Sequence, residues 1–143
     1  IRNREMEKIY SKEKPSTLLG VINRFSSIPE GRVDIAPDDE FIQVSSMRLN
    51  KRKFRPHSHI WKAGEKEVIA QESWIVIKGS VKVTMYDFDN TIISQQILNF
   101  GDISVTFQGG HTYEILEEDT IVYEYKTGPY KGQENDKVFI DED

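Results

Sequence analysis

Three histidines, the only ones in the chain, and one glutamate have the types and spacing of a metal site. His57 and His59 are one residue apart at the end of a run that we expect to be a strand. Since side chains alternate between the two faces of a strand, both imidazoles point the same way. Glu72 opens a later apolar run, and His111 follows two glycines. Three imidazoles and a carboxylate suit Zn, Fe, Mn and Ni alike, so we expect one divalent transition metal ion of undetermined identity.

Each of these residues also has a simpler explanation. His57 and His59 could be surface histidines near a turn, and His111 alone is typical of a turn or core residue. Glu72 could be solvated at the strand end, because a buried carboxylate is costly without a cation or donors. A β-bulge would exchange Glu72 with its neighbour Gln71. Gln71 is therefore both a reserve ligand and a candidate for substrate binding.

Arg55 has the same strand parity as the histidine pair and should face the same way. A guanidinium there could bind a carboxylate or phosphate group of a ligand. The alternative is a salt bridge at the rim of the site.

Four further residues complete the predicted site. Tyr113 has the parity of His111, and Tyr113 and Glu114 are the candidates for a general base. Trp74 and Tyr123 are candidates for the wall of a substrate pocket. Packing in the core is the alternative for Tyr113, Trp74 and Tyr123.

The composition of the 143 residues is that of one globular domain, with 37% hydrophobic and 30% charged residues. No apolar stretch approaches the roughly 20 residues of a membrane-spanning helix, so no membrane partner is expected. The net charge of −5, without a dominant basic patch, argues against a nucleic-acid partner. The absence of cysteine excludes disulfides and thiolate ligands, and fits a cytoplasmic protein.

The elements that must position the site are predicted to be strands. Residues 1–14 are charged and are expected to form a short helical arm, and residues 15–143 a single domain. After residue 15 there is hardly any helical periodicity, whereas alternating runs separated by turn residues are frequent. Loops are expected at 26–39, at 60–66 and from 128 onward. Strands are expected at 18–25, 41–49, 54–59, 68–78, 81–86, 91–98, 101–107, 111–116 and 120–125. This pattern predicts an all-β jelly roll or closed barrel, whose interior can hold a metal and a small ligand.

The spacing of the site residues resembles the cupin superfamily. Its first motif is a His-x-His, a Glu, six residues and a Gly, matched here by His57-Ser-His59, Glu72 and Gly79. Twelve residues separate His59 from Glu72, which we interpret as a loop insertion.

The second cupin motif is a Gly, five residues, a Pro-x-Gly turn and a His. Gly101, the segment 107–110 and His111 match it, with Phe107 in place of the proline. The resemblance covers residues 50–126. It implies a double-stranded β-helix with His57, His59, Glu72 and His111 as metal ligands.

A narrower resemblance, to small bacterial single-domain cupins often encoded among surface-polysaccharide biosynthesis genes, covers most of the chain and rests on four segments: 56–59, 106–111, 113–117 and 126–132. It implies a homodimer that pairs through edge strands, with 18–25 as the spare strand. Two functions follow. One is a metal-dependent isomerase or epimerase of a small sugar-like or acidic substrate, or an iron oxygenase using the same site. The other is a non-catalytic module that binds a saccharide or nucleotide-sugar, with a structural metal or none.

Overall fold

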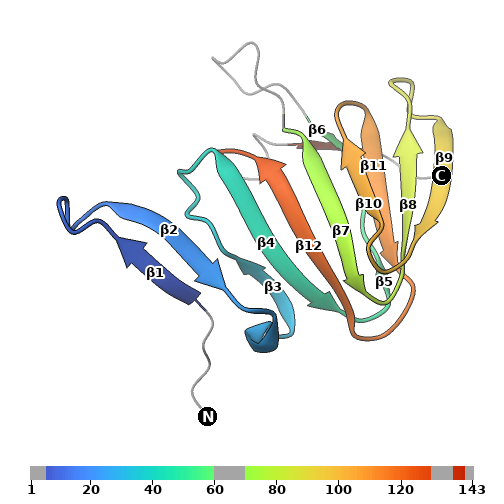
Figure 1. Ribbon diagram of the computed structural model, residues 1–143. Coiled ribbons are helices and arrows are strands. Elements are labelled where there is room, and N and C mark those ends of the chain that lie inside the picture. The colour runs from blue at the N-terminus through green and yellow to red at the C-terminus, as the bar shows by residue number, and fades with distance from the viewer. Residues whose placement is uncertain (1–5, 60–69, 130–136, 141–143) are drawn as a thin grey trace.

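A computed structural model describes residues 6–59, 70–129 and 137–140 of the chain (Figure 1). Within these ranges the chain forms strands and a single turn of 3-10 helix, η1 (Phe25–Ser27). The strands are β1 (Met6–Tyr10), β2 (Leu18–Asn23), β3 (Gly31–Asp34), β4 (Ile42–Leu49), β5 (Arg52–Lys53), β6 (His57–His59), β7 (Glu72–Lys78), β8 (Val81–Tyr86), β9 (Ile92–Leu98), β10 (Ile103–Thr106), β11 (Gly110–Ile115), β12 (Thr120–Thr127) and β13 (Lys137–Phe139).

Two antiparallel sheets form the body of the molecule. The first has the order β10-β7-β12-β4-β3, and the second the order β13-β6-β11-β8-β9, with β5 also paired to β11. Strands far apart in sequence are neighbours in both sheets, as in a jelly roll. The all-β prediction is confirmed in this respect.

The core lies between the two sheets and draws residues from both. Along β7 the side chains of Glu72, Trp74 and Val76 are buried while those between them are partly exposed. Every second side chain therefore points inward, so one face of the strand is buried in the core. The buried cluster contains Met47, Trp74, Val76, Val81, Val83, Leu98, Tyr113, Ile115 and Val122.

The N-terminal helical arm that the sequence suggested is wrong for its described part. Met6–Tyr10 is strand β1, and it pairs antiparallel with Leu18–Asn23 in a separate two-stranded sheet. A helix this short has too few internal hydrogen bonds to offset its nucleation cost, whereas strand pairing gives the backbone groups partners.

Three strands lie where the sequence suggested loops or turns. These are β3 within 26–39, β5 in the segment between the strands expected at 41–49 and 54–59, and β13 within the region from 128 onward. The loop expected at 60–66 and the first residues of the strand expected at 68–78 lie outside the described ranges. Among the described residues, no helix has the length and apolar character needed to cross a lipid bilayer.

Candidate metal centre

Three of the four predicted ligands come together from the two sheets. His57 on β6 and His111 on β11 lie directly opposite each other in neighbouring antiparallel strands. Glu72 opens β7 in the other sheet. Their ligand atoms all lie within 4.8 Å of one another. His111 is 0% exposed and Glu72 is 5% exposed, while His57 is half-buried.

The distances fit ligands of a single ion. Nε2 of His111 lies 3.0 Å from Nε2 of His57 and 3.5 Å from Oε1 of Glu72. With metal–nitrogen bonds of about 2.1 Å, two ligands at a right angle to each other would lie about 3.0 Å apart. The two imidazoles therefore already have the separation that a bound transition metal requires.

The hydrogen bonds behind the two rings give a chemical reason for a cation between them. Nδ1 of His57 lies 3.3 Å from the carbonyl oxygen of Arg55, which can only accept, so Nδ1 carries the proton. In the neutral ring this leaves Nε2 as a bare lone pair. Nδ1 of His111 lies 2.7 Å from Oγ1 of Thr106, a hydroxyl that can accept or donate. If the hydroxyl donates, Nε2 of His111 carries the proton and donates to Nε2 of His57 across the 3.0 Å that separates them. If the hydroxyl accepts, both Nε2 atoms present lone pairs to each other, which is the arrangement that a metal ion between them requires.

The structure also shows which of the neighbours Glu72 and Gln71 faces the two histidines. Glu72 faces the histidines, as in a regular strand, without the bulge that would have exchanged the two residues. Gln71 lies just before β7, where its backbone N–H donates to Oγ1 of Thr127. His59 closes β6, but its side chain lies outside what the structure describes. Its place in the ligand set remains a prediction.

A cavity of about 460 Å³ is lined by two of the three ligands, His57 and Glu72. Its described lining is strongly charged, with four cationic and four acidic side chains among hydrophobic and neutral polar ones. The charged residues are Arg32, Arg55, Lys126, Lys137, Asp34, Asp38, Glu72 and Glu124. Such a surface fits a small polar ligand that carries charge, rather than an apolar one.

Arg55 lies at the cavity as expected from its parity. It is exposed, and its guanidinium lies over the ring of Phe139, 4.2 Å from the centroid. Stacking on a ring holds a guanidinium in place.

Trp74 and Tyr113 form one wall of the cavity. Their rings are stacked, with centroids 3.8 Å apart and an interplanar angle of 1°. The hydroxyl of Tyr113 is hydrogen-bonded to Oγ of Ser104 at 2.8 Å. Burial and the nearby charge of Glu72 raise the pKa of Tyr113 far above its ordinary value, although the Ser104 contact opposes this shift. At neutral pH the phenol therefore keeps its proton.

Glu114 and Tyr123 do not line the cavity that the structure describes. Glu114 follows Tyr113 on β11, and Tyr123 precedes Glu124 on β12. Since neighbouring side chains in a strand point to opposite faces, both are turned away from the cavity.

The paired residues Glu124 and Arg32 are among the cavity residues that were missed in the sequence. Glu124 is buried on β12, where Oε1 accepts from Nη2 of Arg32 at 2.7 Å and Oε2 from Nε1 of Trp74 at 2.8 Å. Burial and the charge of Glu72 raise the pKa of Glu124, and Arg32 opposes this shift. The available signal was that Glu124 is two residues after Val122 in the expected strand, so its carboxylate faces inward with the Val122 side chain.

No protein-family model matches the chain, and no curated protein matches it by sequence. Solved structures do match. CapF, a capsular polysaccharide assembling protein from Staphylococcus aureus, has a TM-score of 0.62 and 13% identity over 76% of this chain and 29% of its own. A putative ethanolamine utilization protein Q from Salmonella typhimurium has a TM-score of 0.58 and 13% identity, over 89% and 96% of the two chains. A cupin-2 domain containing protein from Shewanella frigidimarina has a TM-score of 0.51 and 17% identity, over 73% and 88%.

The similar structures and the two-sheet topology define the class of protein. The chain has the cupin fold, a double-stranded β-helix, and this confirms the resemblance drawn from the motifs. At these identities the likeness establishes the fold, and the chain spans less than a third of CapF.

Proposed function

We propose that this protein is a metal-dependent enzyme that isomerises or epimerises a small sugar-like substrate bearing an acidic group. The observation that carries the proposal is the pair of Nε2 atoms 3.0 Å apart, with the Glu72 carboxylate beside them. A bound divalent ion would act as a Lewis acid on a substrate carbonyl or hydroxyl. The surrounding residues would bind, orient and exchange protons with the substrate.

Recognition of the acidic group would fall to the cations of the cavity. Arg55, Lys126 and Lys137 bring positive charge to its wall, and Arg55 is held on Phe139. A guanidinium binds a carboxylate or phosphate with two parallel hydrogen bonds. The four cationic side chains of the lining are matched by four acidic ones, so a bound divalent ion would supply the net positive charge that suits one or two negative charges on the substrate.

Proton transfer requires a group whose pKa lies near the working pH. The phenol of Tyr113 keeps its proton, and so it would serve as a hydrogen-bond donor to the substrate or as an acid. Glu114 is turned away and would need a different backbone arrangement to act as a base. Glu124 is better placed, because it is buried in the cavity wall and burial raises the pKa of its carboxyl group. We therefore assign the proton-accepting role to Glu124.

A second function, a binding module for a saccharide or nucleotide-sugar, is favoured by one observation. Both oxygens of Glu124 and the hydroxyl of Tyr113 already have hydrogen-bond partners within the protein. Groups held in this way position a ligand well, but they must give up a bond to move a proton.

The metal is tested first, by isothermal titration of the chelator-treated protein with Zn²⁺, Mn²⁺, Fe²⁺ and Ni²⁺. We expect one ion per chain, and a large loss of affinity in Glu72→Gln. Glu114→Gln makes the same chemical change outside the cavity and should bind as the wild type does. If none of the four ions binds, or if Glu114→Gln weakens binding as much as Glu72→Gln, the metal site is rejected.

The two functions are then separated with the metal-loaded protein and a panel of uronic acids, sugar phosphates, nucleotide-sugars and neutral sugars. Ligands are found from the rise in unfolding temperature. For each ligand, proton NMR in deuterium oxide reports whether a carbon-bound hydrogen exchanges with solvent. Exchange that is lost in Glu124→Gln supports the enzyme, whereas binding without exchange or conversion supports the module.

A further inference from the structure

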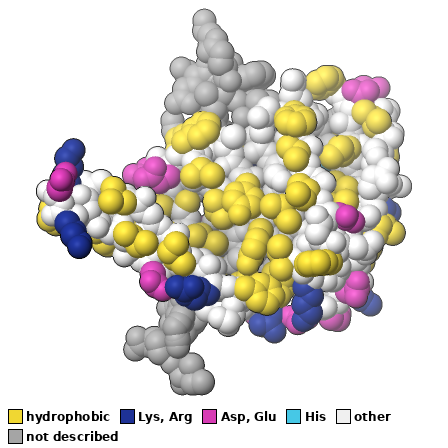
Figure 2. Space-filling view, in the orientation of Figure 1, with side chains coloured by type: hydrophobic (Ala, Val, Ile, Leu, Met, Phe, Trp, Pro, Cys, Tyr) yellow, Lys and Arg dark blue, Asp and Glu magenta, His cyan; other side chains and the backbone are white. Residues whose placement is uncertain are grey.

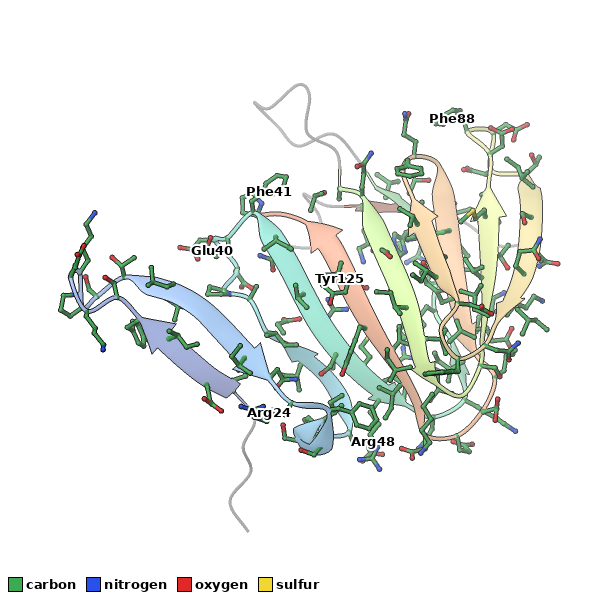
Figure 3. All side chains as sticks on the ribbon, in the orientation of Figure 1. Arg24, Glu40, Phe41, Arg48, Phe88 and Tyr125 are labelled. Atoms are coloured by element: carbon green, nitrogen blue, oxygen red, sulfur yellow. The ribbon has the colours of Figure 1, made fainter. Side chains whose placement is uncertain are left out.

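The inner face of the five-stranded sheet carries a row of polar side chains that begins at the metal centre. The row consists of four residues that lie opposite one another on β10, β7, β12 and β4: Thr106, Glu72, Lys126 and Gln43. Figure 3 labels Glu40 and Phe41, which directly precede β4 at this end of the sheet. Polar groups therefore continue from the metal centre across the neighbouring strands.

A second row lies beside the first and reaches one strand further. It consists of five residues on β10, β7, β12, β4 and β3: Ser104, Trp74, Glu124, Ser45 and Asp34. Every charged side chain of the two rows lines the cavity. Hydrophobic side chains gather on the outer face of the same sheet, as Figure 2 shows. The cavity side of these strands is therefore polar, whereas their outer side is apolar.

The two rows make the cavity longer than a single sugar ring. Neighbouring strands are about 4.8 Å apart, so the three spacings from Glu72 on β7 to Asp34 on β3 amount to about 14 Å. A pyranose ring advances a glycan chain by about one such spacing. A sugar at the metal centre would therefore leave open the part of the cavity over β4 and β3. We call this part the far end; Arg32, Asp34, Asp38 and Gln43 line it.

Asp34 gives the far end a charged acceptor. Among the described residues, its Oδ1 accepts from Nε of Arg32 at 3.0 Å and from Oγ of Ser45 at 2.7 Å, which leaves Oδ2 to accept from a ligand. Burial acts to raise the pKa of Asp34, but the hydrogen bonds from Ser45 and Arg32 outweigh it and lower the pKa below its ordinary value. The carboxylate is therefore ionised at neutral pH and can accept from a hydroxyl group.

Gln43 gives the far end a second acceptor. Its Nε2 donates to the carbonyl oxygens of Pro37 and Glu40, at 2.9 Å and 2.8 Å. These two bonds use both amide hydrogens and hold the side chain in one orientation. The amide oxygen is then the atom that Gln43 can offer to a ligand.

The charges at the two ends of the cavity differ. Arg55 and Lys137 line the cavity from the segments on either side of the histidine strand, before β6 and on its neighbour β13. At the far end, the guanidinium of Arg32 already binds the carboxyl groups of Asp34 and Glu124. An acidic group is therefore favoured near the metal centre, and an uncharged group rich in hydroxyls is favoured at the far end.

We infer that the substrate is a glycan of at least two sugar residues, an inference that rests on the proposed function. The acidic sugar binds at the metal centre beside Arg55, and a neutral sugar linked to it binds at the far end. Asp34 pairs with Ser45, so Gln43 is its diagonal neighbour, and both can accept from hydroxyls of one ring. A nucleotide in the same place would bring a diphosphate close to Asp34 and Asp38, and like charges disfavour this arrangement.

The test measures dissociation constants by isothermal titration of the full chain, loaded with whichever of the four ions binds most tightly. The probes are glucuronic acid and galacturonic acid, each alone and linked at either end to glucose or galactose. Hydrogen bonds from the second sugar to a charged acceptor and an amide should make the best disaccharide bind about tenfold more tightly than its uronic acid. Uridine diphosphate glucuronic acid is the probe for a nucleotide and should show no such gain.

Two variants locate the second sugar. Asp34→Asn removes the charge and Gln43→Met removes the amide, each with little change in size. Each should reduce the gain from the second sugar to about twofold or threefold, and should weaken the uronic acid alone much less. The matched control is Asp39→Asn, because Asp39 is exposed and does not line the described cavity. It should keep the full gain. Circular dichroism and metal titration show that each variant is folded.

Equal affinities for the uronic acids and all their disaccharides overturn the inference. A gain confined to the nucleotide-sugar, kept in both Asp34→Asn and Gln43→Met, or lost in Asp39→Asn overturns it as well. In each of these cases, hydrogen exchange on the uronic acid still tests the proposed function separately. If no probe binds, the inference falls, and the exchange assay on the sugar phosphates decides the proposed function.

Discussion

The hydroxyl of Thr106 lies 2.7 Å from Nδ1 of His111, and both residues are buried. Thr106 is on β10, in the five-stranded sheet, whereas His111 is on β11 in the other. The contact therefore links the two sheets directly behind the proposed metal. With a metal bound, Thr106 would accept the Nδ1 proton and hold the ring of His111 in the tautomer that presents a bare Nε2.

Replacing Thr106 with valine keeps the shape of the side chain but removes the acceptor. Outer partners of this kind contribute about 10- to 100-fold to metal affinity. We expect Thr106→Val to weaken Zn²⁺ or Mn²⁺ binding within that range, as measured by competition with a chromophoric chelator. Thr106→Ser keeps the hydroxyl and should restore most of the affinity. Equal affinities for the valine and serine variants would show that the hydroxyl does not orient the ring.

The pairing of Arg32 with Glu124 supports a second prediction. Glu124 is 7% exposed at its side chain and Arg32 is 47% exposed, so only one partner is buried. Arg32→Met leaves a buried carboxylate with Trp74 as its remaining described hydrogen-bond donor. We expect the free energy of unfolding at pH 7.5 to fall by about 1–3 kcal/mol, less than for a fully buried pair because Arg32 faces water.

The sign of the pH dependence follows from the pKa of Glu124. Burial raises this pKa above the ordinary 4.5, so the folded state binds the proton more tightly than the unfolded state does. The penalty in Arg32→Met should therefore grow as pH rises through the folded-state pKa and shrink toward pH 4.5. In a double-mutant cycle, Arg32→Met in a Glu124→Gln background should cost less than in the wild type. A penalty independent of both pH and residue 124 would mean that Arg32 acts through packing alone.

The spacing of the histidines and the alternation of the strands were sufficient to predict the centre of the fold and a cluster of three residues that could hold a metal. His57, Glu72 and His111 could be predicted because the position of each is set by residues next to it in the sequence. His57 lies in a short strand, Glu72 shares the parity of Trp74 and Val76, and His111 follows a glycine turn.

The unpredicted parts depend on pairing between distant segments. Glu124 is 92 residues from Arg32 in the chain, and no local pattern joins them. Residues 137–139 form a strand because they pair with His57–His59. Likewise, β1 is a strand because Leu18–Asn23 pairs with it. In these segments tertiary pairing outweighs weak local preference.

Gly79 and Gly101 allow a matched test of backbone packing. Both have positive φ angles, +85° and +86°. A methyl group at residue 79 would lie 2.3 Å from Oγ1 of Thr120, whereas one at residue 101 meets nothing within 4 Å. Gly101→Ala should lower the free energy of unfolding by about 1 kcal/mol through backbone strain alone. Gly79→Ala should cost about 1–3 kcal/mol more because of the clash. Equal losses in denaturant unfolding would contradict the close approach of Thr120.

Asp119 provides a test of the charges at the far end of the five-stranded sheet from the metal centre. Its carboxylate accepts from Nε of Arg48 and from Nζ of Lys78, both at 2.5 Å, and so connects the turn before β12 with β4 and β7. Hydrogen bonds from Lys78 and Arg48 lower the pKa of Asp119 below its ordinary 3.8. The stabilisation is therefore present above about pH 4 and is lost as pH falls through the lower, folded-state pKa.

Asp119→Asn is a suitable variant because asparagine also tolerates the φ of +60° at this position. We expect a small drop in unfolding temperature at pH 7, since the group is exposed and its ion pairs are screened. The difference from the wild type should narrow below pH 4 and in 1 M salt. The measurement is a series of thermal melts from pH 2.5 to pH 8. A difference that stays constant over this range would show that the two ion pairs do not stabilise the turn through charge.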